Sequence, residues 1–224
     1  PISAHMADAE RLIAEAKKNP KVVFGGMFQM RSEPRYQKIK KLIDNEELGT
    51  LLRINWIDTD WFRSDAYYSS SAWRATWKGE GGGVTLNQCL HQLDTLSWLV
   101  GMPSQVRGFA QLGRYHQIEV EDNVTAYLEF PDGATGTFTS STGEIPGTNR
   151  LEIVGTRGKV VLENDKLTFI RNEVPSDEWN RTSTTGFGQP DQWTIDIPFG
   201  NADMPHAAYI QNFVDAILDG IPLK

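Results

Sequence analysis

Apolar residues recur at helical spacing early in the chain and then switch to alternation with polar residues. One face of residues 34–48 is apolar, with Pro34 in the first turn and Gly49 as the stop, which predicts a helix. That face is made of Tyr36, Ile39, Leu42 and Ile43. The next segment, LLRINWID, has period two and predicts a half-buried strand. Its buried side would hold Leu52, Ile54 and Trp56.

Residues 103–172 carry a series of alternating segments that are joined by turns without intervening helices. DNVTAYLEF, the turn PDG at 131–133 and ATGTFTSST together predict a hairpin. Other predicted strands are SQVRGFAQL, RLEIVG, KVVLEND and KLTFIRN. We therefore expect an α+β fold, with one large, mostly antiparallel open sheet over residues 50–200 and helices on one face. A last helix is predicted at about 205–218.

The first thirty residues predict one helix and one strand, which are too few elements to form a core. The helix would be capped by Ser3 and stopped by Asn19, and KVVFGGMF would come next as a buried strand. These elements indicate the tail of an α/β domain that lies mostly before residue 1. We therefore divide the chain into residues 1–30 and a second domain, residues 31–224.

The segment GEGGGVTLNQCLHQLD, residues 79–94, holds the candidate chemistry. A helix predicted over 85–100 would carry Asn87 and His91 on one stripe, just after the glycines. Glycines let a ligand approach the backbone, and an imidazole exchanges protons near neutral pH. The alternative is a satisfied, partly buried His91 beside a glycine joint that is only flexible.

Composition narrows the classes of protein that need to be considered. The net charge of −7 and a single short basic run, KIKK, argue against partners with clustered phosphates, either nucleic acids or anionic membranes. The one cysteine excludes an internal disulfide framework. No apolar run is long enough to cross a bilayer and this sequence contains no signal peptide, so a cytoplasmic protein is our expectation.

One polar cluster is left outside the predicted site, and no metal site is predicted. The cluster between strands that contains Tyr115, His116, Glu119, Glu121 and Asp122 is interpreted as a solvated loop. The four histidines share no metal-ligand spacing, so we predict no metal. They are His5, His91, His116 and His206.

Four segments together resemble the Gfo/Idh/MocA family, the oxidoreductases related to glucose–fructose oxidoreductase and inositol dehydrogenase. Pro1 and ISAHMADAERLIAEAK resemble the end of the family's Glu-Lys-Pro motif and the helix after it, and FQMRSEPRYQKIKKLIDNEELG resembles its Phe-Asn-x-Arg-x-x-Pro segment. WRATWKGEGGGVTLNQCLHQLD resembles its block of Trp-Arg, three glycines, Asp or Asn, His and Asp. EIVGTRGKVVLE resembles its late strand-turn-strand. The third match is the most specific.

The resemblance implies a two-part enzyme that transfers a hydride between NAD or NADP and a sugar, inositol or related polyol. A Rossmann domain, of which residues 1–30 would be the tail, would bind most of the cofactor. His91 matches the family's acid/base histidine. Asn87 matches a position that is often Asp, and it would orient the substrate or His91 because an amide cannot buffer a proton. The family's lysine would fall immediately before Pro1, outside this sequence.

The resemblance also implies binding residues around these two. Trp73, Arg74 and Lys78 precede the glycines and would form the substrate rim, by stacking and by charge. Gln29, where the family often has Asn, would lie near the nicotinamide with Pro1. The alternative for the rim residues is a loop packed on the sheet edge, and for Gln29 it is simply the end of a buried strand.

One rival function follows from the resemblance, and a second rival function and an assembly follow from the chain itself. The family also includes glycosidases that use tightly held NAD, and this chain alone could be a non-catalytic sugar-binding or dimerisation module. The threonine-rich strand at 135–142 would leave one sheet face flat. We expect that face to bury against a second copy, in a homodimer or homotetramer.

Overall fold

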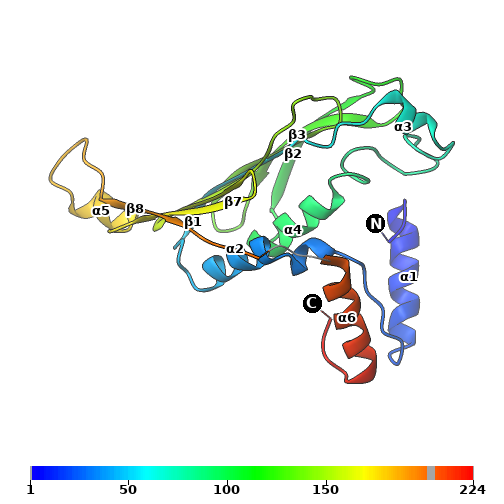
Figure 1. Ribbon diagram of the computed structural model, residues 1–224, viewed down its shortest axis with the longest axis horizontal. Helices are drawn as coiled ribbons and strands as arrows, with labels where there is room; N and C mark the ends of the chain where they lie inside the picture. The colour runs from blue at the N-terminus through cyan, green and yellow to red at the C-terminus, as the bar shows by residue number, and fades with distance from the viewer. Residues whose placement is uncertain (1, 201–204, 224) are drawn as a thin grey trace.

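One eight-stranded sheet dominates the computed structural model, which describes residues 2–200 and 205–223 (Figure 1). Its strands are β1 Leu51–Asp58, β2 Gln105–Leu112, β3 Glu121–Glu129, β4 Thr135–Ser141, β5 Asn149–Gly155, β6 Gly158–Glu163, β7 Lys166–Asn172 and β8 Gln192–Asp196. Their order across the sheet is β2-β3-β4-β1-β5-β6-β7-β8. Every neighbouring pair is antiparallel except β1 and β4, which run parallel. The predicted α+β fold is confirmed.

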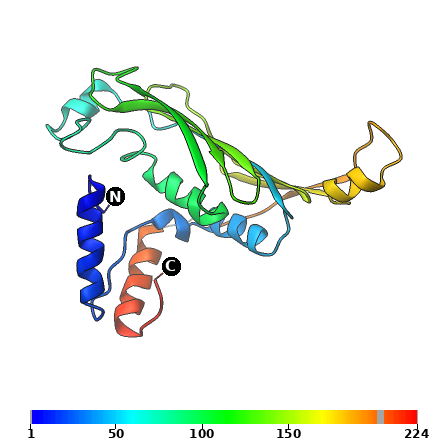
Figure 2. The same ribbon diagram turned by 180° about the vertical axis from the view of Figure 1, so that it is seen from behind.

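The helices fall into a layer on one face of the sheet and a group farther away. The layer contains η1 Gln29–Ser32, α2 Pro34–Asp44 and α4 Leu90–Val100. Helices α1 Met6–Lys18 and α6 Pro205–Leu218 stand beyond this layer, as the front and back views both show (Figures 1 and 2). Short helices α3 Asp65–Ser69 and α5 Ser176–Thr182 lie toward opposite ends of the sheet. Among the described residues, we find no helix with the length and apolar character to cross a membrane.

Aromatic rings from three elements form the centre of the core between the sheet and the helical layer. Tyr36 of α2 lies 5.9 Å from the ring of Trp56 in β1, and Trp56 lies 6.4 Å from Phe138 in β4. All three are almost completely buried. Truncation of such a residue to alanine typically costs about 3–5 kcal/mol, so this group fixes α2 against the central strands.

The N-terminal segment differs from the sequence prediction in two places. The helix begins after His5, and Ser3 donates to the His5 carbonyl at 2.6 Å instead of capping the helix. Residues 21–28 form no strand, and Val22 and Phe24 are 64% and 44% exposed. A strand needs a neighbour for its backbone hydrogen bonds, and no described strand lies beside this segment.

Two helix boundaries and the alternation of one strand also differ from prediction in residues 31–224. Helix α2 ends at Asp44, before Gly49, because Glu46 takes a left-handed conformation with φ 56°. Helix α4 begins only at Leu90, so Asn87 lies in the turn that precedes it. The alternation in β1 fails at Leu52, which is 44% exposed, because the pairing with β5 shifts register there. The predicted last helix is confirmed from Pro205 to Leu218.

Candidate active site

Gly83, the last of the glycines at 81–83, packs against the protein's own strand β3. Gly83 N–H donates to Glu121 Oε2 at 2.9 Å, and Val84 N–H donates to the Glu121 carbonyl at 2.8 Å. A Cβ on Gly83 would lie 1.9 Å from that carbonyl oxygen, so only glycine fits there. Thr85 N–H also donates to the Glu121 carboxylate, at 3.2 Å. The interpretation of these glycines as a backbone that approaches a ligand is wrong for Gly83, because its close neighbour is β3.

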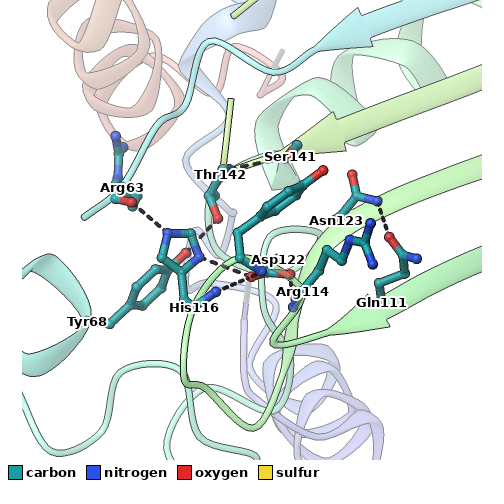
Figure 3. A network of polar contacts seen from close by, with 11 residues as sticks. Arg63, Tyr68, Gln111, Arg114, His116, Asp122, Asn123, Ser141 and Thr142 are labelled. Atoms are coloured by element: carbon teal, nitrogen blue, oxygen red, sulfur yellow. Dashed lines mark hydrogen bonds and ion pairs between the residues drawn. The ribbon is translucent and has the colours of Figure 1, made fainter. Parts of the chain in front are cut away.

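A buried His–Asp pair attaches the loop after β1 to the sheet (Figure 3). His116 Nδ1 lies 3.0 Å from Asp122 Oδ2, and His116 Nε2 lies 2.8 Å from the carbonyl oxygen of Arg63. Asp122 also accepts three backbone N–H groups of its own loop at 2.7–3.0 Å. The hydroxyl of Tyr68 is 2.8 Å from that of Thr142 in the same network. The loop after β1 is therefore held in one position.

This network corrects the interpretation of the polar cluster as a solvated loop. His116, Glu121 and Asp122 are 8%, 6% and 0% exposed, whereas Tyr115 and Glu119 do face solvent. A carboxylate buried in this way requires several donors, and each of these two has them. Glu119 also accepts Trp77 N–H at 3.2 Å. The acidic run anchors the segment that carries the candidate site.

His91 lines two neighbouring cavities, each of about 720 Å³. The polar cavity lies between α2, α4 and the sheet, and its lining includes Gln29, Glu33, Arg35, Asp60, Trp61, Gln92 and Asn149. The apolar cavity lies toward the N-terminal segment, and its lining includes Leu12, Phe24, Phe28, Trp73, Leu86, Asn87 and Leu90. His91 is therefore the part of the wall that the two spaces share.

The surroundings of His91 favour a neutral imidazole. Its ring packs edge-on against Phe28, with centroids 6.0 Å apart, and its Nδ1 is sealed from solvent without a hydrogen-bond partner in the described protein. Burial lowers the pKa of His91 below its ordinary value of 6.5. At pH 7 the ring is therefore uncharged and able to accept a proton.

Asn87 reaches the apolar cavity from the turn before α4. Its Nδ2 donates to Glu80 Oε1, and Glu80 Oε2 accepts Ala75 N–H at 2.7 Å. Glu80 thus fixes the orientation of the Asn87 amide, which leaves Oδ1 without a hydrogen bond in the described protein. Asn87 and His91 lie beside the same cavity, although Asn87 is not on the helix that was predicted to carry both.

The predicted rim residues separate in the structure. Trp73 lines the apolar cavity with His91. Arg74 stacks 4.5 Å from the Trp73 ring and 4.4 Å from Tyr67, and donates to the Tyr67 hydroxyl at 2.7 Å, so it supports the wall instead of lining it. Lys78 is exposed and is not part of the lining of either cavity.

Of the two residues predicted to lie near a cofactor, Gln29 and Pro1, the structure places only Gln29. Gln29 lines the polar cavity beside His91. Pro1 lies outside the described residues. The side chains of the apolar cavity fit the nicotinamide end of NAD or NADP, because the Phe28 ring offers a flat apolar surface, beside Leu90 and next to the polar Asn87 and His91.

Sequence reasoning missed several residues of the polar cavity, chiefly Asp60, Trp61 and Gln92. Gln92 could have been found from the sequence, because it directly follows the predicted site residue His91 on α4. Asp60 and Trp61 come just after a predicted strand, where substrate-contacting loops commonly lie. Among the described residues, no group of three or more His, Cys, Asp or Glu side chains could hold a metal ion.

The fold and the cavities define an α+β domain in which one histidine separates a polar space from an apolar one. Residues 36–161, more than half of the chain, match the model of the GFO/IDH/MocA C-terminal domain, and the chain belongs to this family. Helix α2, helix α4 and strands β1–β5 all lie within the match, apart from the first two residues of α2.

Two curated relatives are matched over about half of their own length. Myo-inositol 2-dehydrogenase of Thermotoga maritima is 24% identical over 76% of this chain and 49% of its own length. Trans-1,2-dihydrobenzene-1,2-diol dehydrogenase of Sus scrofa is 24% identical over 83% of this chain and 56% of its own length. The chain thus spans about half the length of these relatives.

Solved structures share the fold at low sequence identity. The WlbA dehydrogenase from Bordetella pertussis, in complex with NADH and UDP-GlcNAcA, has a TM-score of 0.75 at 23% identity, covering 99% of this chain and 60% of its own. Levoglucosan dehydrogenase, in complex with NADH and levoglucosan, has a TM-score of 0.69 at 20% identity, covering 89% of this chain and 58% of its own.

Proposed function

We propose that this chain is the substrate-binding part of an NAD(P)-dependent oxidoreductase that acts on a hydroxyl or carbonyl carbon of a sugar, inositol or related polyol. The observation that carries the proposal is the position of His91 between an apolar and a polar cavity. A nicotinamide ring suits the first cavity and a polyhydroxylated molecule suits the second, so the reacting carbon would lie beside the imidazole.

In this proposal His91 exchanges the proton of the reacting hydroxyl. When bound, the nicotinamide supplies the hydride acceptor or donor. The neutral imidazole takes the hydroxyl proton during oxidation and returns it during reduction. Asn87 orients the substrate or His91 through its free Oδ1. The turn that carries Asn87 depends on Gly83, because a side chain at Gly83 would displace that turn. Trp73 adds a stacking surface at the edge of the apolar cavity.

The charges of the polar cavity favour an uncharged substrate over a sugar acid. Glu33, Asp60, Glu163 and Asp165 line it, and Arg35 is the one arginine or lysine of that lining. Both Glu33, at 2.7 Å, and Asp165, at 3.0 Å, already pair with Arg35. A carboxylate on the substrate would meet net negative charge without a free cation beside it.

Two alternatives remain distinguishable by experiment. An NAD-dependent glycosidase would release no free reduced cofactor during turnover, whereas a dehydrogenase releases it stoichiometrically. A non-catalytic sugar-binding or dimerisation module would bind polyols without any change in nicotinamide absorbance, even when joined to a cofactor-binding domain.

The test of His91 uses the protein that carries the cofactor-binding domain, assayed with a panel of inositols, neutral sugars and sugar acids. His91→Ala should lower the rate by about 10²–10⁴-fold, the usual contribution of a general acid–base group, and added imidazole should restore part of it. Asn87→Ala should mainly raise KM. Normal turnover by a folded His91→Ala protein would refute the assignment.

A further inference from the structure

The carboxyl group of Asp58, at the end of β1, is sealed inside the protein without a partner. Asp58 is 0% exposed, and neither Oδ1 nor Oδ2 makes a hydrogen bond within the described protein. No described cation forms an ion pair with it. An ionised carboxylate in such a place loses its hydration without compensation, which is among the most costly arrangements in a protein interior.

Two of the groups next to Asp58 also contain buried polar atoms without a hydrogen-bond partner. Asp60 and Trp61 come shortly after it in the chain and Gln92 approaches it from α4, yet none of them makes a hydrogen bond of normal geometry with it. Trp61 Nε1 and Gln92 Oε1 are themselves sealed and unpartnered. Four unpartnered polar atoms therefore come from three neighbouring side chains: Asp58 Oδ1 and Oδ2, Trp61 Nε1 and Gln92 Oε1.

A single proton on Asp58 would give all four of these atoms a hydrogen-bond partner. An ionised Asp58 only accepts hydrogen bonds, so it leaves the acceptor Gln92 Oε1 without a donor. A carboxylic acid donates its O–H to Oε1 and accepts one N–H of the same amide on its carbonyl oxygen. Trp61 Nε1–H is then left to donate to the remaining lone pair of Asp58. The second N–H of Gln92 is not used in this pairing.

The titratable groups around Asp58 agree with a neutral state. Burial, and after it the Asp60 carboxyl, raises the pKa of Asp58 to about 8. Tyr36, from α2, and Cys89, from the turn before α4, both act electrostatically with Asp58, and burial raises the pKa of each. Asp60, Tyr36 and Cys89 are all acids, so none of them supplies the positive charge that would favour an ionised Asp58.

We propose that Asp58 is a neutral carboxylic acid that holds the Gln92 amide at the wall of the polar cavity, where its free N–H binds a substrate hydroxyl beside His91. The assignment of the ligand rests on the function proposed above, whereas the protonation of Asp58 does not. Asp58 is a positioning residue in this arrangement, because it acts through Gln92, and Gln92 is a substrate-binding residue.

The proposal predicts a specific dependence of stability on pH. The unfolded chain ionises Asp58 near its ordinary pKa of 3.8, and the folded chain keeps the proton to about pH 8. The folded state thus binds more protons between these values, and the stability contributed by Asp58 is lost as the pH rises from about 4 to about 8. Asp58→Asn can form the same paired hydrogen bonds with Gln92 and has no proton to lose.

The first test compares the wild-type chain with Asp58→Asn, using Asp132→Asn in the exposed β3–β4 turn as the matched control. The ratio of unfolding constants, wild type over Asp58→Asn, should rise about tenfold per pH unit between pH 4 and 8 and then level off. The infrared carbonyl band of a protonated carboxylic acid should be present at pH 7 in wild type and Asp132→Asn and absent from Asp58→Asn. No such band, or a constant ratio across this range, would overturn the protonation.

The second test concerns the substrate and uses the complete enzyme with the best substrate of the panel. Asp58→Ala and Gln92→Leu should each raise KM about tenfold with a smaller change in kcat, whereas Asp58→Asn should stay near wild type. Unchanged KM in the first two variants would overturn the role of Gln92. Failure of the proposed function would appear separately, as normal turnover by His91→Ala with the titration of Asp58 intact.

Discussion

Arg31 and Asp94 form a two-point ion pair that joins the turn of Gln29 to the helix of His91. Arg31 Nε donates to Asp94 Oδ2 at 2.7 Å, and Nη2 donates to Oδ1 at 2.5 Å. Asp94 lies one helical turn after His91, and the Arg31 guanidinium also lies 5.8 Å from the Phe28 ring that packs on His91. One pair of side chains therefore fixes the helix and the ring that together position the imidazole.

Replacement of Arg31 by lysine should loosen this arrangement. Lysine keeps the charge but cannot make two parallel hydrogen bonds, so we expect a loss of about 1–3 kcal/mol in the free energy of unfolding. Urea unfolding monitored by circular dichroism measures it. Arg181→Lys is the matched control, because Arg181 forms an exposed pair with Asp177 at 3.4 Å and its replacement should leave the midpoint unchanged. Equal midpoints for wild type and Arg31→Lys would contradict the role of the pair.

Gly83 should tolerate no side chain. A Cβ there would lie 1.9 Å from the Glu121 carbonyl oxygen, whereas a Cβ on Gly108 in β2 would meet nothing within 4 Å. Gly83→Ala should therefore lower the melting temperature by several degrees, while Gly108→Ala should leave it unchanged or raise it slightly. Differential scanning calorimetry of the two variants decides the matter. Similar melting temperatures would show that the turn does not depend on contact with β3.

The buried pair of His116 and Asp122 should control the order of the loop after β1. His116→Phe removes both ring hydrogen bonds and takes one donor from a fully buried carboxylate, which typically costs about 1–3 kcal/mol. Hydrogen exchange should accelerate most in residues 59–70, because the carbonyl oxygen of Arg63 loses its contact with His116. His206→Phe, at an exposed histidine, is the control. Unchanged exchange in that loop would mean that other contacts hold it.

The sheet face opposite the helices should bind a second copy of the chain. The pairing registers place Ile57, Thr139, Thr125 and Phe109 in one row across four strands on that face. Phe109 is 75% exposed and Ile57 is 38% exposed. We expect a concentration-dependent dimer in analytical ultracentrifugation that Phe109→Glu weakens. Phe187→Glu, in a loop outside the sheet, should not weaken it. A monomer at every concentration would contradict this expectation.

The sequence predicted local elements well and their partners poorly. Period-two alternation placed β1 and β3 because it depends only on which side of a strand is buried. A short apolar run with β-branched residues wrongly predicted a strand at 21–28, because such a run cannot show whether a neighbouring strand exists. The parallel pairing of β1 with β4 was not predicted for the same reason.

In the candidate site, too, the local spacing was predicted well and the contacts with distant segments were not. The spacing of Asn87 and His91 predicted that they would lie near each other, and they line one cavity, although the helix begins too late to hold Asn87. The contact of Glu121 with Gly83 and the position of Asp58 beside Gln92 depend on contacts between distant segments. No local pattern encodes such contacts, and the acidic residues had the composition of a solvated loop.

The parallel pairing at the centre of the sheet also sets the order in which the protein can assemble during synthesis. Asn55 of β1 and its register partner Thr137 of β4 are 82 residues apart. At roughly 5–20 residues per second, a ribosome needs about 4–16 s to make that interval. The central strand therefore emerges long before its neighbours, with Ile54 and Trp56 unprotected, and the antiparallel pair of β2 and β3 is the first part of the sheet able to close. A chaperone that binds nascent apolar strands would meet β1 before any other strand of this sheet.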